Sequence, residues 1–159
     1  MLIGTAAASL VGLTFVALSI TQGYMTEEFL PGQRIFMAPI LIQFVNVFVA
    51  SLILIAPLNA VASGACVLVC GIAGVAHAAW VLHRSRKLEE RIASDDQIFY
   101  IFGPLVCYLA VIAGAALVAL REPASSYVLA VAILLLLLLT IRNVWDLMVW
   151  AVIRSSKPK

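Results

Sequence analysis

Long apolar stretches alternate with short polar segments along the whole chain. A helix rises about 1.5 Å per residue, so roughly 20 apolar residues cross the ~30 Å hydrocarbon core of a bilayer. The pattern predicts five membrane-spanning helices, over residues of about 2–22, 36–57, 60–83, 98–120 and 126–150. The fifth is expected to continue past Trp145, because the apolar pattern resumes at Val144. We therefore predict an all-α integral membrane bundle, with one transmembrane domain over residues 1–159.

The composition favours the same class of protein. Of the 159 residues, 64% are apolar and 11% are charged, whereas soluble domains have about 45–50% and 25%. Five spans would take up roughly 100 residues, which leaves too little chain for a water-soluble domain. This excludes a nucleotide-binding fold, a periplasmic receptor and an enzyme with a large aqueous active-site domain. The net charge of +2 is too small to predict nucleic acid as a partner.

Lysine and arginine residues are distributed unequally between the two sides of the predicted bundle. One side has Arg121 alone. The other side has eight basic residues: Arg34, Arg84, Arg86, Lys87, Arg91, Arg154, Lys157 and Lys159. The positive-inside rule then places the N-terminus outside and the C-terminus in the cytoplasm. The first stretch has no basic residue before its apolar core and no cleavage site after it, so we expect a retained helix rather than a signal peptide.

Three local signals add detail to the predicted spans. Residues 30–33 (Leu-Pro-Gly-Gln) are typical of a type II turn. Residues 94–97 (Ser-Asp-Asp-Gln) predict a capping box at the start of the fourth helix. Pro104 is expected to kink that helix and to free a carbonyl that a neighbour must satisfy.

Small residues recur along two of the spans, and in lipid they let helix backbones approach closely. Those expected to pack are Gly4, Ala8 and Gly12 in the first span, and Gly64, Gly71, Gly74 and Ala78 in the third. We therefore expect these two helices to be central. Residues 134–139 place leucine on every face of the fifth helix. These faces are more than one five-helix unit can bury, which predicts a homo-oligomer or contacts with other integral membrane proteins.

Polar side chains inside the spans are the candidate functional residues, because a buried amide or charge is costly without a partner. The candidate cluster consists of Gln43, Asn46, His77, Arg142, Asn143 and Asp146. Two interpretations of Arg142 stay open. It forms an interfacial ion pair with Asp146 beside Trp145 and Trp150, or it faces a polar cavity with Gln43 and Asn46 and binds an anion or gates a path.

No cofactor, metal or catalytic residue is predicted. Cys66, Cys70 and Cys107 lie in apolar runs, where free cysteines behave as small apolar residues. His77 shares a helix face with Cys66 and Cys70, but Cys66 and His77 are about 16 Å apart along a helix, too far to share one ion. For His77 we expect a structural hydrogen bond, with a proton relay as the alternative. The chain lacks G-x-S-x-G, H-E-x-x-H, C-x-x-C and Walker motifs, so we expect no enzyme.

Four segments resemble a family of small bacterial polytopic inner-membrane proteins of unknown function, whose members are sometimes labelled modulators of the FtsH protease. These segments are residues 10–20 (LVGLTFVALSI), 30–34 (LPGQR), 52–57 (LILIAP) and 142–150 (RNVWDLMVW). Asn143 and Trp145 match its C-terminal pattern. The resemblance implies a multi-pass protein of the bacterial inner membrane, in contact with membrane lipids, and brings no catalytic residue.

Two hypotheses for the function follow. The first is a non-enzymatic integral membrane scaffold or regulatory subunit that binds other membrane proteins through helix–helix contacts. The alternative is a small oligomeric ion or solute channel or carrier, with a path lined by Asn46, Gln43, His77 and Arg142 in the cytoplasmic half of the membrane. This alternative requires those side chains to converge on one water-accessible cavity.

Overall fold

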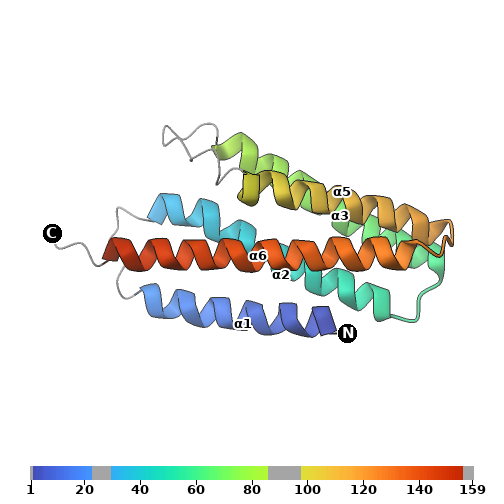
Figure 1. Ribbon diagram of the computed structural model, residues 1–159, viewed down its shortest axis with the longest axis horizontal. Coiled ribbons are helices and arrows are strands. Elements are labelled where there is room, and N and C mark those ends of the chain that lie inside the picture. The colour runs from blue at the N-terminus through green and yellow to red at the C-terminus, as the bar shows by residue number, and fades with distance from the viewer. Residues whose placement is uncertain (1, 23–29, 86–97, 156–159) are drawn as a thin grey trace.

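The computed structural model describes residues 2–22, 30–85 and 98–155, and these residues are almost entirely helical. Its elements are α1 (Leu2–Gln22), α2 (Leu30–Ile55), α3 (Ala60–Ser85), the π-helical turn η2 (Ile98–Phe102), α5 (Gly103–Ala119) and α6 (Ser125–Ser155). Successive helices run in opposite directions, and the start of α1 and the end of α6 lie at opposite ends of the bundle (Figure 1). The all-α prediction is thus confirmed.

Three helices are long and apolar enough to cross a membrane. The corresponding segments are Ala60–His83, Phe99–Ala119 and Ser125–Asp146. The apolar helical segments of α1 and α2 within the described part of the chain are shorter, at Leu2–Leu13 and Pro39–Ile55. A helical membrane protein is therefore supported, while five crossings and the orientation of the termini stay predictions.

The ends of the helices follow from local chemistry, and one predicted turn is wrong. Residues 30–33 begin α2 instead of forming a type II turn before a helix at Phe36. Pro31 fits this first helical turn because the amide groups there have no partner within a helix. The start of α3 is capped by Asn59, whose Oδ1 accepts a 2.8 Å hydrogen bond from the Ala62 amide. The predicted capping box at 94–97 lies outside the described residues.

The order of packing differs from the expectation that the first and third helices are central. In the described bundle, α1 lies at the edge and contacts only α2 and α6. The helix α6 contacts α1, α2 and α5, and α3 packs most closely against α5 (Figure 1). The physical reason is that the small residues of α3 face α5 rather than α1.

Glycines bring α3 and α5 together. A Cβ atom added at Gly64 would lie 2.9 Å from the Ala115 carbonyl oxygen, and one at Gly71 would lie 2.7 Å from Ile112 Cγ1. At Gly74 an added Cβ would overlap the ring of Tyr108. Ala78, the last member of this stripe, is also buried.

The small residues of α1 pack at one position only. A Cβ atom at Gly4 would lie 2.8 Å from Ser51 Cβ on α2, whereas one at Gly12 would meet nothing within 4 Å. Ala8 is exposed as well. The predicted packing ridge is therefore wrong at Ala8 and Gly12 within this chain, because α1 is an edge helix with one side uncovered.

Candidate functional site

The candidate site lies where η2 meets α6. Its arrangement follows from Pro104, which leaves a backbone carbonyl of η2 without a donor. Proline has no amide hydrogen, so it cannot donate to the Tyr100 carbonyl in an α-helical register. The π-helical register pairs residues five apart and makes Phe99 the partner of Pro104. The structure has π-helical geometry at residues 98–102. The Phe99 carbonyl therefore requires a donor from another element.

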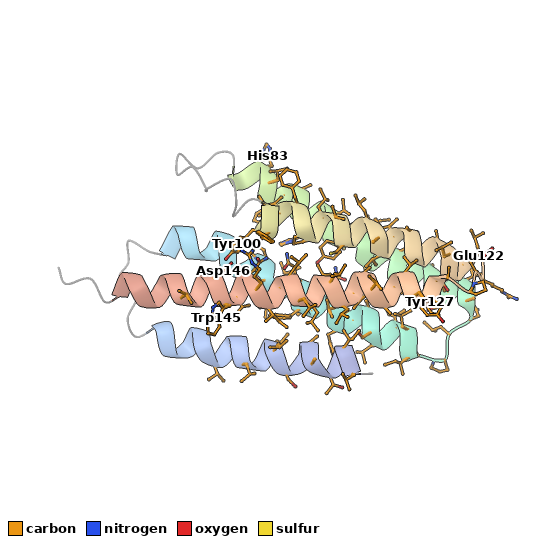
Figure 2. All side chains as sticks on the ribbon, viewed as in Figure 1. His83, Tyr100, Glu122, Tyr127, Trp145 and Asp146 are labelled. Carbon is orange, nitrogen blue, oxygen red and sulfur yellow. The ribbon has the colours of Figure 1, made fainter. Side chains whose placement is uncertain are left out.

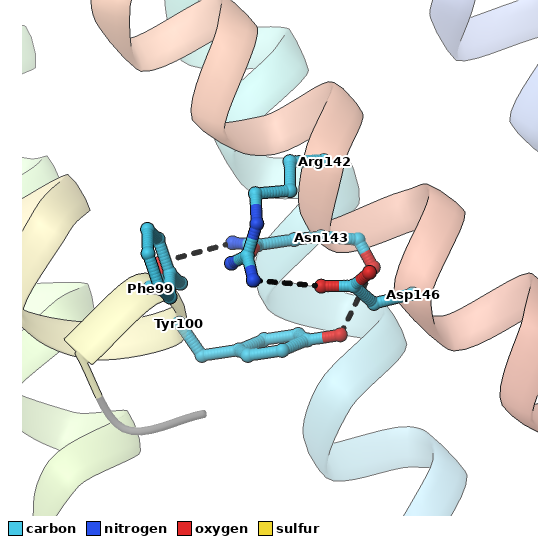
Figure 3. Close-up of polar contacts among 5 residues, drawn as sticks. All are labelled: Phe99, Tyr100, Arg142, Asn143 and Asp146. Carbon is cyan, nitrogen blue, oxygen red and sulfur yellow. Dashed lines mark hydrogen bonds and ion pairs between the residues drawn. The ribbon is translucent and has the colours of Figure 1, made fainter. Parts of the chain in front are cut away.

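Asn143 of α6 supplies that donor. Its Nδ2 donates to the Phe99 carbonyl oxygen at 3.2 Å. In the opposite direction, Tyr100 Oη donates to the Asn143 carbonyl oxygen at 3.0 Å (Figure 3). The Asn143 residue is 1% exposed. Two hydrogen bonds thus join η2 to α6, and the neighbour expected for Pro104 is identified.

Arg142 lies beside this junction, at the edge of the bundle. Its guanidinium carbon lies 3.4 Å from the centroid of the Phe99 ring, and Nη2 lies 3.5 Å from Asp146 Oδ2 (Figure 3). The side chains of Arg142 and Asp146 are 43% and 37% exposed. Half-exposed pairs of this kind contribute about 0–1 kcal/mol in water. Of the two interpretations of Arg142, the structure contains the ion pair. The side chain of Trp150 lies outside the described part.

Gln43 joins α2 to α6 in the buried part of the bundle. Thr140 Oγ1 lies 3.1 Å from Gln43 Oε1 and 2.6 Å from the Leu136 carbonyl oxygen, and it donates to either. The single hydroxyl hydrogen serves one acceptor at a time. When it serves Leu136, a Gln43 amide turned by 180° can donate to Thr140 Oγ1 instead. The pair is therefore satisfied inside the bundle.

Asn46 and His77 contact neither the Arg142 junction nor the Gln43–Thr140 pair in these interactions. Asn46 Nδ2 donates to the Cys70 carbonyl oxygen at 3.0 Å and so joins α2 to α3. The His77 ring stacks on Trp80 of the same helix, with the ring centroids 6.0 Å apart. Within the described residues, no group of three histidine, cysteine, aspartate or glutamate side chains could hold a metal ion.

The six predicted residues therefore do not form one cluster. Arg142, Asn143 and Asp146 lie together at the junction with η2, whereas Gln43, Asn46 and His77 each have a partner elsewhere. The alternative interpretation, a polar cavity that joins Arg142 to Gln43 and Asn46, is not present among these contacts of the described residues. Each of these three side chains contacts a different helix.

Phe99, Tyr100 and Thr140 make these contacts through η2 and α6 but were not predicted as site residues. Phe99 and Tyr100 are aromatic residues in an apolar span, and nothing in their pattern separates them from ordinary core positions. Thr140 could have been predicted from the sequence, because it is the polar residue that directly follows the leucine run and lies three residues before Asn143. Residues three apart share a helix face.

Comparisons with known proteins give no relative: no family model, no curated protein and no solved structure matches the chain. The resemblance to small bacterial inner-membrane proteins stays a prediction. The function must therefore be inferred from the geometry of the chain itself.

Proposed function

We propose that the protein is a five-span integral protein of the bacterial cytoplasmic membrane that acts as a non-enzymatic scaffold or regulatory subunit. It binds other integral membrane proteins through helix–helix contacts. The observation that carries the proposal is that three amide side chains inside the bundle, two of them buried and Asn46 half-buried, bond within the chain. Gln43, Asn46 and Asn143 each bond to another helix of the same chain. They stabilise the bundle, which leaves the outer faces of the helices for recognition.

The orientation in this proposal has the N-terminus outside and the C-terminus in the cytoplasm. The helix directions support it, because the end of α1, the start of α2, the end of α3 and the end of α6 lie at one end of the bundle (Figure 1). The basic residues Arg34, Arg84 and Arg154 belong to those helix ends, whereas Arg121 follows α5 at the other end. This asymmetry matches the positive-inside rule.

The edge helix α1 is the surface through which we expect a helix of a partner protein to bind. Thr5, Ala8, Ser9 and Gly12 are all exposed there. Small side chains permit a close approach of two backbones, which supplies the van der Waals contact that holds helices together in lipid. Replacing Gly12 by leucine tests this surface without disturbing the fold, because nothing lies within 4 Å of an added Cβ.

The experiment is affinity purification of the full chain from its native membrane after mild solubilisation and cross-linking. We expect a defined integral partner with the wild-type chain and its loss with Gly12→Leu. The control is Ala116→Leu, an exposed alanine of α5, a helix that does not contact α1. Recovery of the chain without any partner would overturn the proposal. If the chain were recovered only with a second copy of itself, the α1 surface would serve a homo-oligomer instead of a different partner protein.

A second experiment addresses the channel or carrier. Ion flux in proteoliposomes that Arg142→Ala and Asn46→Leu both alter would favour that function instead.

A further inference from the structure

Exposed aromatic residues of α6 mark two levels along its axis. Tyr127 and Trp145 are 78% and 69% exposed. They are about 27 Å apart at the helical rise, close to the roughly 30 Å thickness of a hydrocarbon core. Figure 2 shows Tyr127 and Glu122 toward one end of the bundle and Trp145 and Asp146 toward the other. Tyrosine and tryptophan gather at the two membrane interfaces, so Trp145 marks one interface.

This level places the Arg142–Asp146 pair at the membrane boundary, with its charges in a defined order. Arg142 lies one helical turn on the membrane side of Trp145, and Asp146 follows Trp145 directly. The backbone position of Arg142 is thus about 6 Å deeper than that of Asp146 at the helical rise, and the two charged groups lie 3.5 Å apart. This order depends only on α6 crossing the bilayer and holds for either orientation of the protein.

Among the contacts of the described residues, the pair keeps donors that no partner uses. A guanidinium has five N–H donors, and one nitrogen, Nη2, forms the ion pair with Asp146 at 3.5 Å. The Phe99 ring lies against one face of the guanidinium. It holds the group in place by a cation–π contact and leaves the edges with their N–H groups. Both charged side chains are about two-fifths exposed, at 43% and 37%.

We propose that Arg142 and Asp146, positioned by Phe99, bind the headgroup of a zwitterionic phospholipid that carries a primary ammonium, of the phosphatidylethanolamine type. In such a lipid the phosphate is attached to the glycerol and lies deeper, and the ammonium lies farther into the water. The phosphate accepts hydrogen bonds from Arg142, and the ammonium donates to the carboxylate of Asp146.

The same geometry disfavours the other common headgroups. An anionic phosphatidylglycerol headgroup places the same phosphate on Arg142 but has no cation for the Asp146 carboxylate, so the negative charge of Asp146 stays uncompensated. A phosphatidylcholine headgroup has a cation, but its quaternary nitrogen has no N–H group to donate. The site therefore distinguishes lipids by the ammonium group as well as by the phosphate.

The test is native mass spectrometry of the full chain in detergent, with equimolar phosphatidylethanolamine, phosphatidylcholine and phosphatidylglycerol. We expect phosphatidylethanolamine adducts to dominate. Arg142→Gln should lower them roughly tenfold, the effect of losing one hydrogen bond to a charged group. Asp146→Asn should remove the preference for phosphatidylethanolamine over phosphatidylglycerol, because the carboxylate that attracts the ammonium is lost. Arg121→Gln is the control, since Arg121 is the exposed arginine at the other end of the bundle.

Two further arms complete the test. In the first, soluble O-phosphoethanolamine is added as a competitor. Displacement of the lipid would show that the headgroup alone is enough for binding. No displacement would show that the acyl chains are also required. In the second, Arg142→Lys keeps the positive charge and should retain part of the lipid binding. This variant replaces Arg142→Gln in the test if Arg142→Gln does not fold. Equal adducts of all three lipids on the wild-type chain, or an unchanged preference in Asp146→Asn, would overturn the proposal. Partner recruitment through α1 does not enter this test, so the two proposals fail separately.

Discussion

Asn143 of α6 donates a 3.2 Å hydrogen bond to the carbonyl of Phe99, which lies five residues before Pro104. Pro104 withholds an amide hydrogen from the start of α5, and a side chain of another helix replaces it. This relationship explains why an amide is buried in an apolar helix. The proline of one span and the asparagine of another therefore belong to one structural unit.

Replacing Asn143 by leucine should destabilise the bundle by about 1–2 kcal/mol, because the Phe99 carbonyl loses its donor. Pro104→Ala restores an amide hydrogen beside the free carbonyl, so the double variant should recover part of the loss. The measurement is a double-mutant cycle on unfolding in mild detergent, with an expected coupling energy of about 1 kcal/mol. Strictly additive effects would contradict the link between the two residues.

Tyr100→Phe serves as the matched variant for the same junction. It removes the 3.0 Å bond to the Asn143 carbonyl but leaves the Phe99 carbonyl paired with Asn143. The loss should therefore be smaller, about 0.5–1 kcal/mol, in the range of a net interhelical hydrogen bond in lipid. A larger effect than that of Asn143→Leu would show that the tyrosine, not the amide, holds the junction.

Alanine at two glycines should have opposite effects. Gly74→Ala places a methyl group into the ring of Tyr108, and overpacking of this kind costs about 1–3 kcal/mol. Gly12→Ala meets nothing within 4 Å and should stabilise α1 by about 0.5–1 kcal/mol through helix propensity. Thermal unfolding of both variants by circular dichroism checks this pair. Equal destabilisation by both would contradict the assignment of α1 to the edge of the bundle.

The Gln43–Thr140 contact predicts an asymmetry between its two partners. Thr140→Val leaves the buried Gln43 amide without this bond and should cost about 1–3 kcal/mol. Gln43→Leu should cost less, because the Thr140 hydroxyl keeps its 2.6 Å bond to the Leu136 carbonyl. The double variant should be close to the wild type, since two apolar groups replace both partners. Chemical denaturation of the three variants measures this order, and a reversed order of the single variants would contradict it.

The proposed orientation is tested by labelling single cysteines in a background where Cys66, Cys70 and Cys107 are replaced by alanine. Cysteine at Ser126, near the start of α6, should react with an impermeant maleimide added outside intact cells. Cysteine at Ser155, the last residue of α6, should react only after the membrane is permeabilised. Labelling at Ser155 in intact cells would reverse the orientation, and labelling at both positions would exclude that α6 crosses the membrane.

The candidate site could be predicted only in part. The ion pair of Arg142 with Asp146 follows from a spacing of four on one helix, and the need for a donor near Pro104 follows from the chemistry of proline. The identity of that donor does not follow, because Asn143 and Phe99 come from segments 44 residues apart in the chain. The separation of Gln43 from Asn46 is a matter of helix rotation. They are one turn apart, and a modest angle sends one toward α6 and the other toward α3.

The sequence by itself determined the helical class, the approximate limits of the helices and the unequal distribution of basic residues, because these depend on the local run of apolar and charged side chains. Tertiary structure decided which helices are neighbours, which glycines are contact points and which polar groups meet. In lipid, nearly every helix face is apolar, so hydrophobicity does not tell one neighbour from another. The choice rests on shape, as where Gly74 makes room for the Tyr108 ring. It also rests on a few hydrogen bonds, such as that of Asn143 to the Phe99 carbonyl. Both kinds of contact exist only between folded helices.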